Sequence, residues 1–301
     1  MQQVIGVLFN GLSLSSILLL TAVGLAITFG LMKVINMAHG EFIMMGAYTT
    51  FVVQQLFLSF APGAFDLSYL VALVAAFAFT FLFGCVLEKL VISRLYGRVV
   101  DSLLATAGIS IILQQAARSI FGERGVNVTA PSWLSGGISL GGVTFSYNRL
   151  FIIMLAVLSL VLVVLIMRKT KFGLQMRAVM QNRDMARCMG INSRRIDMLT
   201  FGIGSGLAGL AGCSVALLGS VDSTVGQLYI VDSFMAVVLG GVGNLVGTVF
   251  GSSIIGFSSI GIETGLSSAD IAKCLVLLII IVFLQFKPQG LFAGRTRQLD
   301  E

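Results

Sequence analysis

The sequence contains little charge. Of its 301 residues only 11% are charged and 57% are hydrophobic, and the mean hydropathy is +1.00. Because soluble domains carry about 25% charged and about 45–50% apolar residues, this composition excludes a soluble globular protein. Uncharged stretches at 42–65 and 67–87 each exceed the roughly 20 residues that a helix needs to cross a bilayer, and similar stretches recur along the chain. The composition therefore predicts a multi-pass membrane protein.

Histidine and cysteine are also scarce, which limits the chemistry that the chain can perform. There is one histidine, His39, and no two of the four cysteines form a Cys-x-x-Cys pair. Such a set offers neither a zinc site nor a redox motif. No second histidine or nearby acid accompanies His39 and Glu41 for general acid–base catalysis. The sequence therefore predicts no metal, no cofactor, no catalytic residue and no enzymatic activity.

Nucleotide-binding motifs are missing as well. The chain has no Gly-x-x-x-x-Gly-Lys-[Ser/Thr] loop, so any ATP that drives it must bind to another subunit. The segment Gly204-Ser-Gly206-Leu-Ala-Gly209 does match the Gly-x-Gly-x-x-Gly pattern of dinucleotide-binding folds. Residues 198–221 carry no charge, however, whereas the crossover helix of such a fold has a solvated, charged face. We therefore assign this motif to helix packing.

Most of the positive charge lies in three clusters. Short loops rich in Lys and Arg stay on the cytoplasmic side of a membrane, so all three clusters should face the cytoplasm. The net charge of +6 then needs no nucleic-acid partner. The longer polar loop that contains Asn127, Pro131 and Trp133 should lie outside. The clusters are Lys89, Arg94 and Arg98; Arg168, Lys169, Lys171, Arg177, Arg183, Arg187, Arg194 and Arg195; and Lys287, Arg295 and Arg297.

Because all three clusters are expected on the same side, the chain must cross the membrane an even number of times between one cluster and the next. The uncharged run 233–262 must then form two segments, and Gly240, Gly241, Gly243 and Asn244 are suited to interrupt a helix there. The predicted fold is all-α, a polytopic transmembrane helical bundle of about nine helices (eight to ten) in a single domain over residues 1–301. The predicted spans are 4–32, 42–64, 67–88, 102–120, 149–167, 198–220, two within 233–262, and 271–286.

Glycine is abundant, with 35 residues. Small residues let membrane helices approach closely, and the four-residue spacing of Gly243, Gly247 and Gly251 makes a stripe on one helix face. Gly202 and Gly206 make a second stripe. Both are predicted to be packing surfaces. The functional alternative is a broken helix that lines a substrate path, for which Gly240, Gly241 and Asn244 are the candidates.

The stretch 168–197 is too polar to cross the bilayer but well suited to form a helix. Its apolar residues alternate with Arg177, Arg183 and Arg187 without forming one clean stripe. One interpretation is a loop that sets the orientation and lies on anionic lipid headgroups. The other is a docking helix for a cytoplasmic partner. In either case Gly190 is expected to end the helix before the next span.

Several short segments of the chain have a distinctive wording. They are Gly-Leu-x-Leu-x-Ser at 11–16, Gly24-Leu-Ala-Ile-Thr-Phe-Gly30, Val34-Ile-Asn-Met-Ala-His-Gly-Glu-Phe42, Gly46-Ala-Tyr48, Arg177-Ala-Val with 186–192, and Leu239-Gly-Gly-Val-Gly243. These segments resemble the permeases of branched-chain amino acid ABC importers, and the resemblance extends from Gly11 to Leu291. The wording of 35–41 and 46–54 most closely resembles the urea importer branch of that family.

This resemblance implies a multi-pass subunit of the bacterial inner (plasma) membrane, in contact with membrane lipid. Its partners would be a second, related permease, two cytoplasmic ATP-binding subunits and a periplasmic or extracellular substrate-binding protein. The loop 168–197 corresponds to the one that such permeases insert into a cleft of the ATPase. The residues implied in ATPase coupling are Arg177, Arg183, Ala186, Arg187, Gly190 and Ile191.

Asn36, His39 and Glu41 lie at the predicted cytoplasmic mouth between two spans. They are either solvated there or line the pathway or its gate, since a carboxylate within the bilayer must be paired or reach water. Apart from His39 and Glu41, the predicted spans show almost no charge pair to meet the two ends of a zwitterion, which favours urea. Branched-chain amino acids or short amides are the alternative. A passive channel for small solutes is the alternative from another class, although a channel needs no docking loop.

Overall fold

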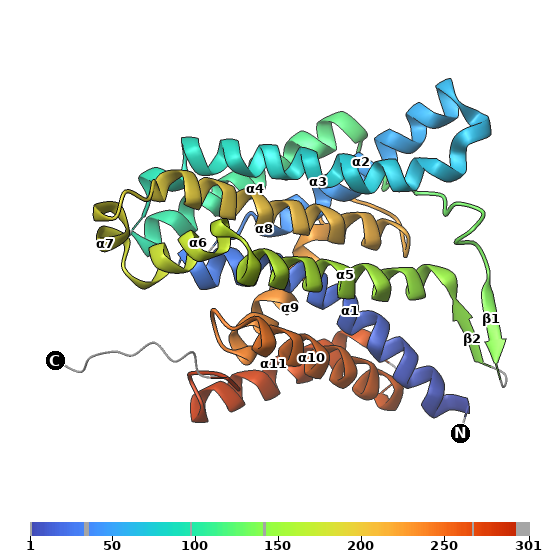
Figure 1. Cartoon of the computed structure of the whole chain (residues 1–301). Coiled ribbons are helices and arrows are strands. Elements are labelled where there is room, and N and C mark those ends of the chain that lie inside the picture. The colour runs from blue at the N-terminus through green and yellow to red at the C-terminus, as the bar shows by residue number, and fades with distance from the viewer. Residues whose placement is uncertain (1, 33–35, 97, 141–142, 267, 293–301) are drawn as a thin grey trace.

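Helices make up most of the computed structural model (Figure 1), which describes residues 2–32, 36–96, 98–140, 143–266 and 268–292. Val34, Ile35, Arg295 and Arg297, which the sequence analysis used, lie outside these ranges. The α-helices are α1 (Gln2–Met32), α2 (His39–Phe60), α3 (Phe65–Leu90), α4 (Val99–Phe121), α5 (Tyr147–Lys169), α6 (Lys171–Gln181), α7 (Arg183–Cys188), α8 (Ser193–Ala216), α9 (Val225–Gly240), α10 (Leu245–Leu266) and α11 (Ala269–Phe286). Short 3-10 helices cover Pro62–Ala64 and Ile92–Arg94.

The prediction of an all-α membrane bundle is confirmed. In the described part of the chain, eight helices are long and apolar enough to cross a membrane, and α9 is a shorter apolar helix of 16 residues. The predicted break within 233–262 is also confirmed, because α9 ends at Gly240 and α10 begins at Leu245. However, α9 starts at Val225, eight residues before the predicted run. The prediction required an uncharged segment, and Asp232 lies in the middle of this helix.

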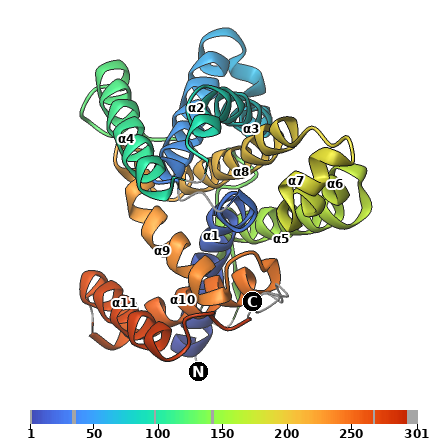
Figure 2. The same cartoon turned by 90° about the vertical axis from the view of Figure 1, so that its left-hand side faces the viewer.

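The centre of the bundle is built from α1 and α8, and α2 and α3 pack against α8 (Figure 2). Glycines of α8 allow this close packing. A Cβ atom on Gly212 would lie 2.0 Å from the Ile43 carbonyl oxygen of α2, and one on Gly46 would lie 2.2 Å from that of Gly209. Gly202 and Gly206 lie against side chains of α3, where a Cβ atom would come within 2.5 Å of Cys85 Sγ and within 2.6 Å of the Phe77 ring. The packing role predicted for the Gly202 and Gly206 stripe is confirmed.

The C-terminal helices α9, α10 and α11 lie on the other side of α1. Within the predicted stripe, Gly247 and Gly251 of α10 face the backbone of α9 at Gly240 and Ala236, close enough to leave no space for a Cβ atom. Gly243 lies instead in the turn between the helices, with a positive φ of 84°. In Figure 2, α4 and α11 are at separate edges of the bundle with α9 between them.

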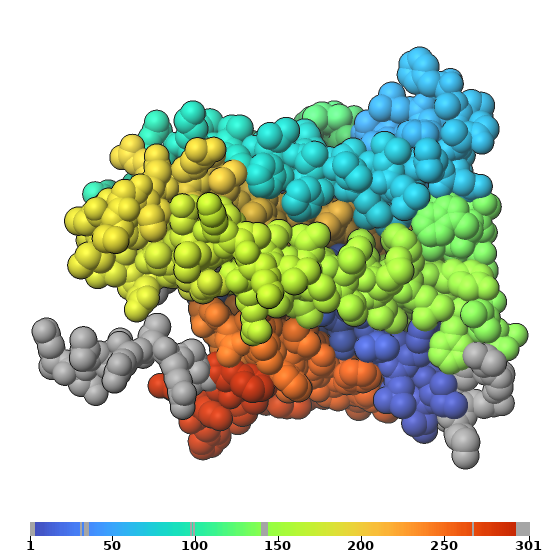
Figure 3. Space-filling model, viewed as in Figure 1, coloured from blue at the N-terminus to red at the C-terminus, as the bar shows by residue number. Residues whose placement is uncertain are grey.

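Connecting segments gather at the two ends of the bundle. The short helices α6 and α7 project from one end, which we call the α7 end (Figures 1 and 3). The N-terminal part of α1 and an antiparallel hairpin, β1 (Gly137–Leu140) and β2 (Val143–Ser146), lie at the opposite end, the hairpin end. The hairpin was not predicted, because four-residue strands in a polar loop give only a weak alternating pattern. This arrangement places the loop 168–197 and the loop of Trp133 at opposite ends, as the charge pattern requires.

Candidate functional site

Asn36, His39 and Glu41 are buried at the beginning of α2. Their exposed fractions are 2%, 0% and 1%, so the solvated alternative does not describe them. The Asn36 side-chain oxygen accepts a hydrogen bond from the Ala38 backbone N–H at 3.0 Å, which shapes the entry to the helix. The Nε2 atom of His39 lies 3.3 Å from the Thr21 carbonyl oxygen of α1. Glu41 lies in the first turn, where the helix dipole favours a negative charge.

The Glu41 carboxyl group connects α2 to α4. Its Oε1 atom accepts hydrogen bonds from the Ser110 hydroxyl at 2.8 Å and from the Gln114 amide at 2.7 Å. Three buried polar atoms of this region have no hydrogen-bond partner in the described structure: Glu41 Oε2, Asn36 Nδ2 and His39 Nδ1. Buried polar groups are normally paired. These three atoms are therefore the unmet hydrogen-bonding capacity at the start of α2.

A polar stripe runs along α4 toward this cluster, and sequence reasoning missed it. Thr106 accepts a hydrogen bond from the Met37 backbone N–H at 3.2 Å, and Arg118 donates one to the Ser223 hydroxyl at 2.8 Å. The four-residue spacing was the available signal, since residues i and i+4 share one helix face. The stripe consists of Ser102, Thr106, Ser110, Gln114 and Arg118.

The residues Gly240, Gly241 and Asn244 form a turn that is covered by the C-terminal segment. The Phe292 backbone N–H donates to the Gly240 carbonyl oxygen at 3.1 Å. Gly241 adopts a φ of 103°, a conformation that favours glycine. The Asn244 side chain accepts from the Val246 N–H at 3.0 Å at the start of α10. In the described structure, no hydrogen bond or ion pair joins this turn to Asn36, His39 or Glu41.

The loop 168–197 folds into two helices, and its polar residues explain the ends. Thr170, Asn182 and Asn192 each cap the helix that follows, through a side-chain oxygen that accepts a backbone N–H. Gly190 ends α7 with a φ of 81°, and the Ile191 N–H returns to the Ala186 carbonyl oxygen at 3.0 Å. This is the C-terminal turn that the sequence predicted at Gly190.

Arg183 holds this loop against the ends of α3 and α8. Its guanidinium group forms an ion pair with Asp197 and lies 4.4 Å from the centre of the Tyr96 ring. The Tyr96 hydroxyl donates to buried Glu88 at 3.0 Å. Burial and the nearby Glu88 charge raise the pKa of Tyr96, so its hydroxyl keeps the proton that it donates. We call Glu88, Tyr96, Arg183 and Asp197 the Arg183 network.

The other residues predicted to contact the ATPase divide into two groups. Ala186 and Ile191 pack against the core. Arg177 donates to the Met167 carbonyl oxygen, and Arg187 donates to the Ser193 hydroxyl at 2.9 Å while it pairs with Asp184. The most exposed apolar side chains of this loop are ones that the sequence analysis did not assign to coupling. They are Leu174, Met185 and Met189, with exposed fractions of 61%, 61% and 77%.

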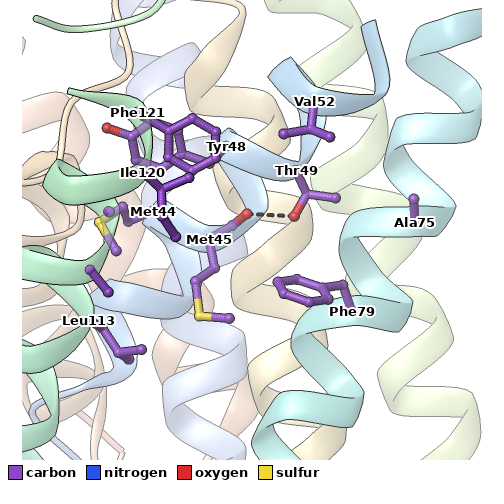
Figure 4. A pocket seen from close by; sticks show the side chains of 12 residues that line it. Met44, Met45, Tyr48, Thr49, Val52, Ala75, Phe79, Leu113, Ile120 and Phe121 are labelled. Carbon is purple, nitrogen blue, oxygen red and sulfur yellow. Dashed lines mark hydrogen bonds between the residues drawn. The ribbon is translucent and has the colours of Figure 1, made fainter. Parts of the chain in front are cut away.

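Between α2, α3 and α4 lies an apolar cavity of about 520 Å³ (Figure 4). The Tyr48 ring stacks on Phe121 with centroids 4.2 Å apart. Met44, Met45 and Phe79 also line the cavity. The Thr49 hydroxyl is turned to its own helix, where it donates to the Met45 carbonyl oxygen at 2.7 Å. This lining suits an apolar occupant and offers little to a polar solute.

A second recess, of about 240 Å³, lies between α9, α10 and α11. It contains an ion pair between Asp232 and Lys273, whose charged atoms are 3.9 Å apart. The expectation that the spans hold almost no cation–anion pair besides His39 and Glu41 is therefore wrong. Forty residues separate the two partners in the sequence, so the pair was invisible before α9 and α11 were placed side by side.

Comparison with known proteins gives matches over nearly the whole chain. The family profile described as "Branched-chain amino acid transport system / permease component" matches residues 7–284. The permease BraD of Pseudomonas aeruginosa, named for a high-affinity branched-chain amino acid transport system, is 30% identical over 94% of each chain. LivH of Escherichia coli K12, from a system of the same name, is 26% identical over 94% of each chain. A probable LivH of Methanocaldococcus jannaschii is 26% identical over 92% of this chain and 89% of its own length. No solved structure matches the chain.

Proposed function

Because the chain belongs to the permease family of branched-chain amino acid transport systems, we propose that it is the membrane subunit of an ATP-driven importer for a small polar solute. The observation that carries this proposal is the match over residues 7–284 to a permease family, in a chain that folds as a bundle of membrane-spanning helices. Its proposed partners are a second, related permease, two ATP-binding subunits and an external substrate-binding protein.

The loop 168–197 is the proposed contact with the ATP-binding subunits, at the cytoplasmic face. It projects beyond the bundle at the α7 end (Figure 3). Leu174, Met185 and Met189 offer an exposed apolar surface there, and such a surface on a polar loop typically serves contact with another protein. We therefore assign the contact with the ATP-binding subunits to these three side chains. Arg183 is assigned the role of holding the loop against α3 and α8. This division favours an importer over a passive channel, which needs no such surface.

The solute path is proposed to pass between the start of α2 and the polar stripe of α4. Glu41, Ser110 and Gln114 meet there, and Glu41 Oε2 and Asn36 Nδ2 have no hydrogen-bond partner in the described structure. Hydrogen-bonding groups along a helix inside the membrane are costly unless they are paired or reach water or solute. The four-residue spacing on α4 gives a ladder of such groups along the direction of transport.

Urea is the first proposed solute, and branched-chain amino acids are the second. Urea is supported by the likeness of 35–41 and 46–54 to the urea importer branch. Amino acids are supported by the printed names of the curated relatives. The Asp232–Lys273 pair would offer an anion and a cation to the two ends of a zwitterion. Because an external binding protein contributes much of the discrimination in such importers, the permease alone favours urea only weakly.

Uptake by intact cells tests this proposal. Labelled urea at low concentration is expected to enter only when the gene for this chain is intact, and excess leucine is expected not to compete. Uptake should stop when cellular ATP is exhausted. Strong competition by leucine, with urea uptake unaffected by the deletion, would favour the amino acid assignment. Uptake that persists without ATP would indicate a passive channel.

The Glu41→Gln variant tests the path itself. Glutamine keeps an oxygen that can accept from Ser110 and Gln114, but it replaces the unpaired Oε2 acceptor with an N–H donor. We expect solute uptake to fall about tenfold, the effect of losing one well-placed buried hydrogen bond, while the melting temperature of the purified protein stays the same. The matched control is Glu123→Gln, at an exposed position. Unchanged uptake, or a fall in melting temperature that accounts for the loss, would contradict the assignment.

A further inference from the structure

The recess between α9, α10 and α11 collects four polar side chains in an otherwise mostly apolar surrounding. Gln227 and Asp232 come from α9, Ser259 from α10 and Lys273 from α11. The rest of the lining is apolar apart from Cys274. Polar side chains within membrane helices are costly and usually mark a function or a specific partner. Four of them converge here on one cavity from three helices.

These polar groups have few partners within the described chain. Asp232 and Lys273 form an ion pair with each other at 3.9 Å, and neither has another ion pair or a side-chain hydrogen bond in the described residues. Neither Gln227 nor Ser259 has a side-chain hydrogen bond in the residues that the structure describes. By comparison, neighbouring Ser252, Ser253 and Thr264 of α10 all donate to carbonyl oxygens of their own helix. Gln227 is exposed and Lys273 is about half exposed, so the recess presents donors and an acceptor to a molecule that enters it.

We propose that this recess binds the transported solute, through a carboxylate at Asp232 and an ammonium group at Lys273. The inference rests on the proposed function and adds a solute site on α9, α10 and α11 to the proposed contacts on α2 and α4. Lys273 lies in the first turns of α11, toward the hairpin end, and Asp232 lies halfway along α9. The ion pair therefore lies beside the middle of α9, away from both ends of that helix.

The pair selects a solute that carries a hydrogen-bond donor and an acceptor a few ångströms apart. In urea, two N–H groups can donate to the Asp232 carboxylate while the carbonyl oxygen accepts from Lys273. In an amino acid, the ammonium group meets Asp232 and the carboxylate meets Lys273. Both solutes fit within about 240 Å³. The shared chemistry is a small dipolar or amide solute, and the experiment separates the two.

Cys274 provides a native probe, because it lines the recess and is exposed. In the complete importer without ATP, with Cys85→Ala, Cys188→Ala and Cys213→Ser in the background, a small polar thiol reagent should modify Cys274. Urea or leucine should slow this reaction, by about threefold when the solute is at twice its Kd. Protection by urea alone indicates an amide site, protection by leucine alone indicates a zwitterion site, and protection by both indicates the shared chemistry.

Asp232→Asn and Lys273→Met should each abolish the protection while Cys274 still reacts. Asp270→Asn is the control, since it changes the same residue type on α11 outside the recess. The proposal is overturned if Cys274 is inert, if neither solute protects it, or if protection survives in both variants. Uptake measured on the same background reports on the proposed function separately, because an importer whose solute site lies elsewhere would still accumulate solute without protecting Cys274.

Discussion

Gly212→Ala is expected to remove most of the folded protein from the membrane. The added Cβ atom would lie 2.0 Å from the Ile43 carbonyl oxygen and 2.8 Å from the Ala47 backbone nitrogen. These are backbone atoms of α2, so no side chain can rotate to make space, and α2 must move away from α8. Overpacking of this kind costs about 1–3 kcal/mol or more. The amount of extractable protein and its melting temperature in detergent should both fall.

A glycine on the surface of α10 provides the matched control. A Cβ atom on Gly261 would meet nothing within 4 Å, so Gly261→Ala removes backbone freedom without a collision. Alanine is favoured over glycine in a helix by about 1 kcal/mol, and the melting temperature should rise slightly or stay the same. An equal loss in both variants would show that glycine content, rather than the α2–α8 contact, determines stability.

Arg183→Ala is expected to reduce transport about tenfold or more, within the range of a coupling free energy of about 1–3 kcal/mol. The guanidinium group connects α7 to Asp197 of α8 and to Tyr96, which in turn donates to Glu88 of α3. Its removal leaves Asp197, only 7% exposed, without its partner. The loop should then no longer move together with α3 and α8. Both solute uptake and substrate-stimulated ATP hydrolysis can be measured in the reconstituted importer. The two should no longer change together, and uptake should fall more than hydrolysis.

Two comparison variants distinguish a loss of coupling through the Arg183 network from a loss of contact with the ATP-binding subunits. Arg98→Ala breaks an exposed ion pair with Asp101, which is worth at most about 1 kcal/mol, and should leave uptake unchanged. Met189→Asp places a charge on the exposed apolar surface and should release the ATP-binding subunits during purification, whereas Arg183→Ala should retain them. Normal coupling in Arg183→Ala would remove the network from the mechanism.

Composition and charge pattern were enough to predict the class of fold. The backbone N–H and C=O groups of a long uncharged segment must be hydrogen-bonded inside the bilayer, and in a chain of this kind a helix achieves this. The basic clusters determined which loops lie on the same side of the membrane. The break at Gly240 to Asn244 and the end of α7 at Gly190 were also local properties, since a positive φ at glycine needs no distant partner. For the same reason, the caps at Asn182 and Asn192 depend only on nearby residues.

The roles of particular side chains depended on contacts that local patterns do not contain. Arg183 appeared to be one of several exposed arginines until Asp197 and Tyr96 were placed beside it. The Glu41 contacts with α4 bridge about 70 residues.

The sequence by itself determined a multi-pass helical bundle, because hydropathy and charge act on each segment separately and the bilayer imposes the same requirement on all of them. Only the tertiary structure decided which polar groups are buried together. Asp232 even obscured the start of its own helix, since a lone acid lowers the hydropathy of α9, and its partner Lys273 lies on α11. A buried charge is stabilised by whichever group lies next to it in space, and that neighbour is fixed by the packing of helices rather than by their order in the chain.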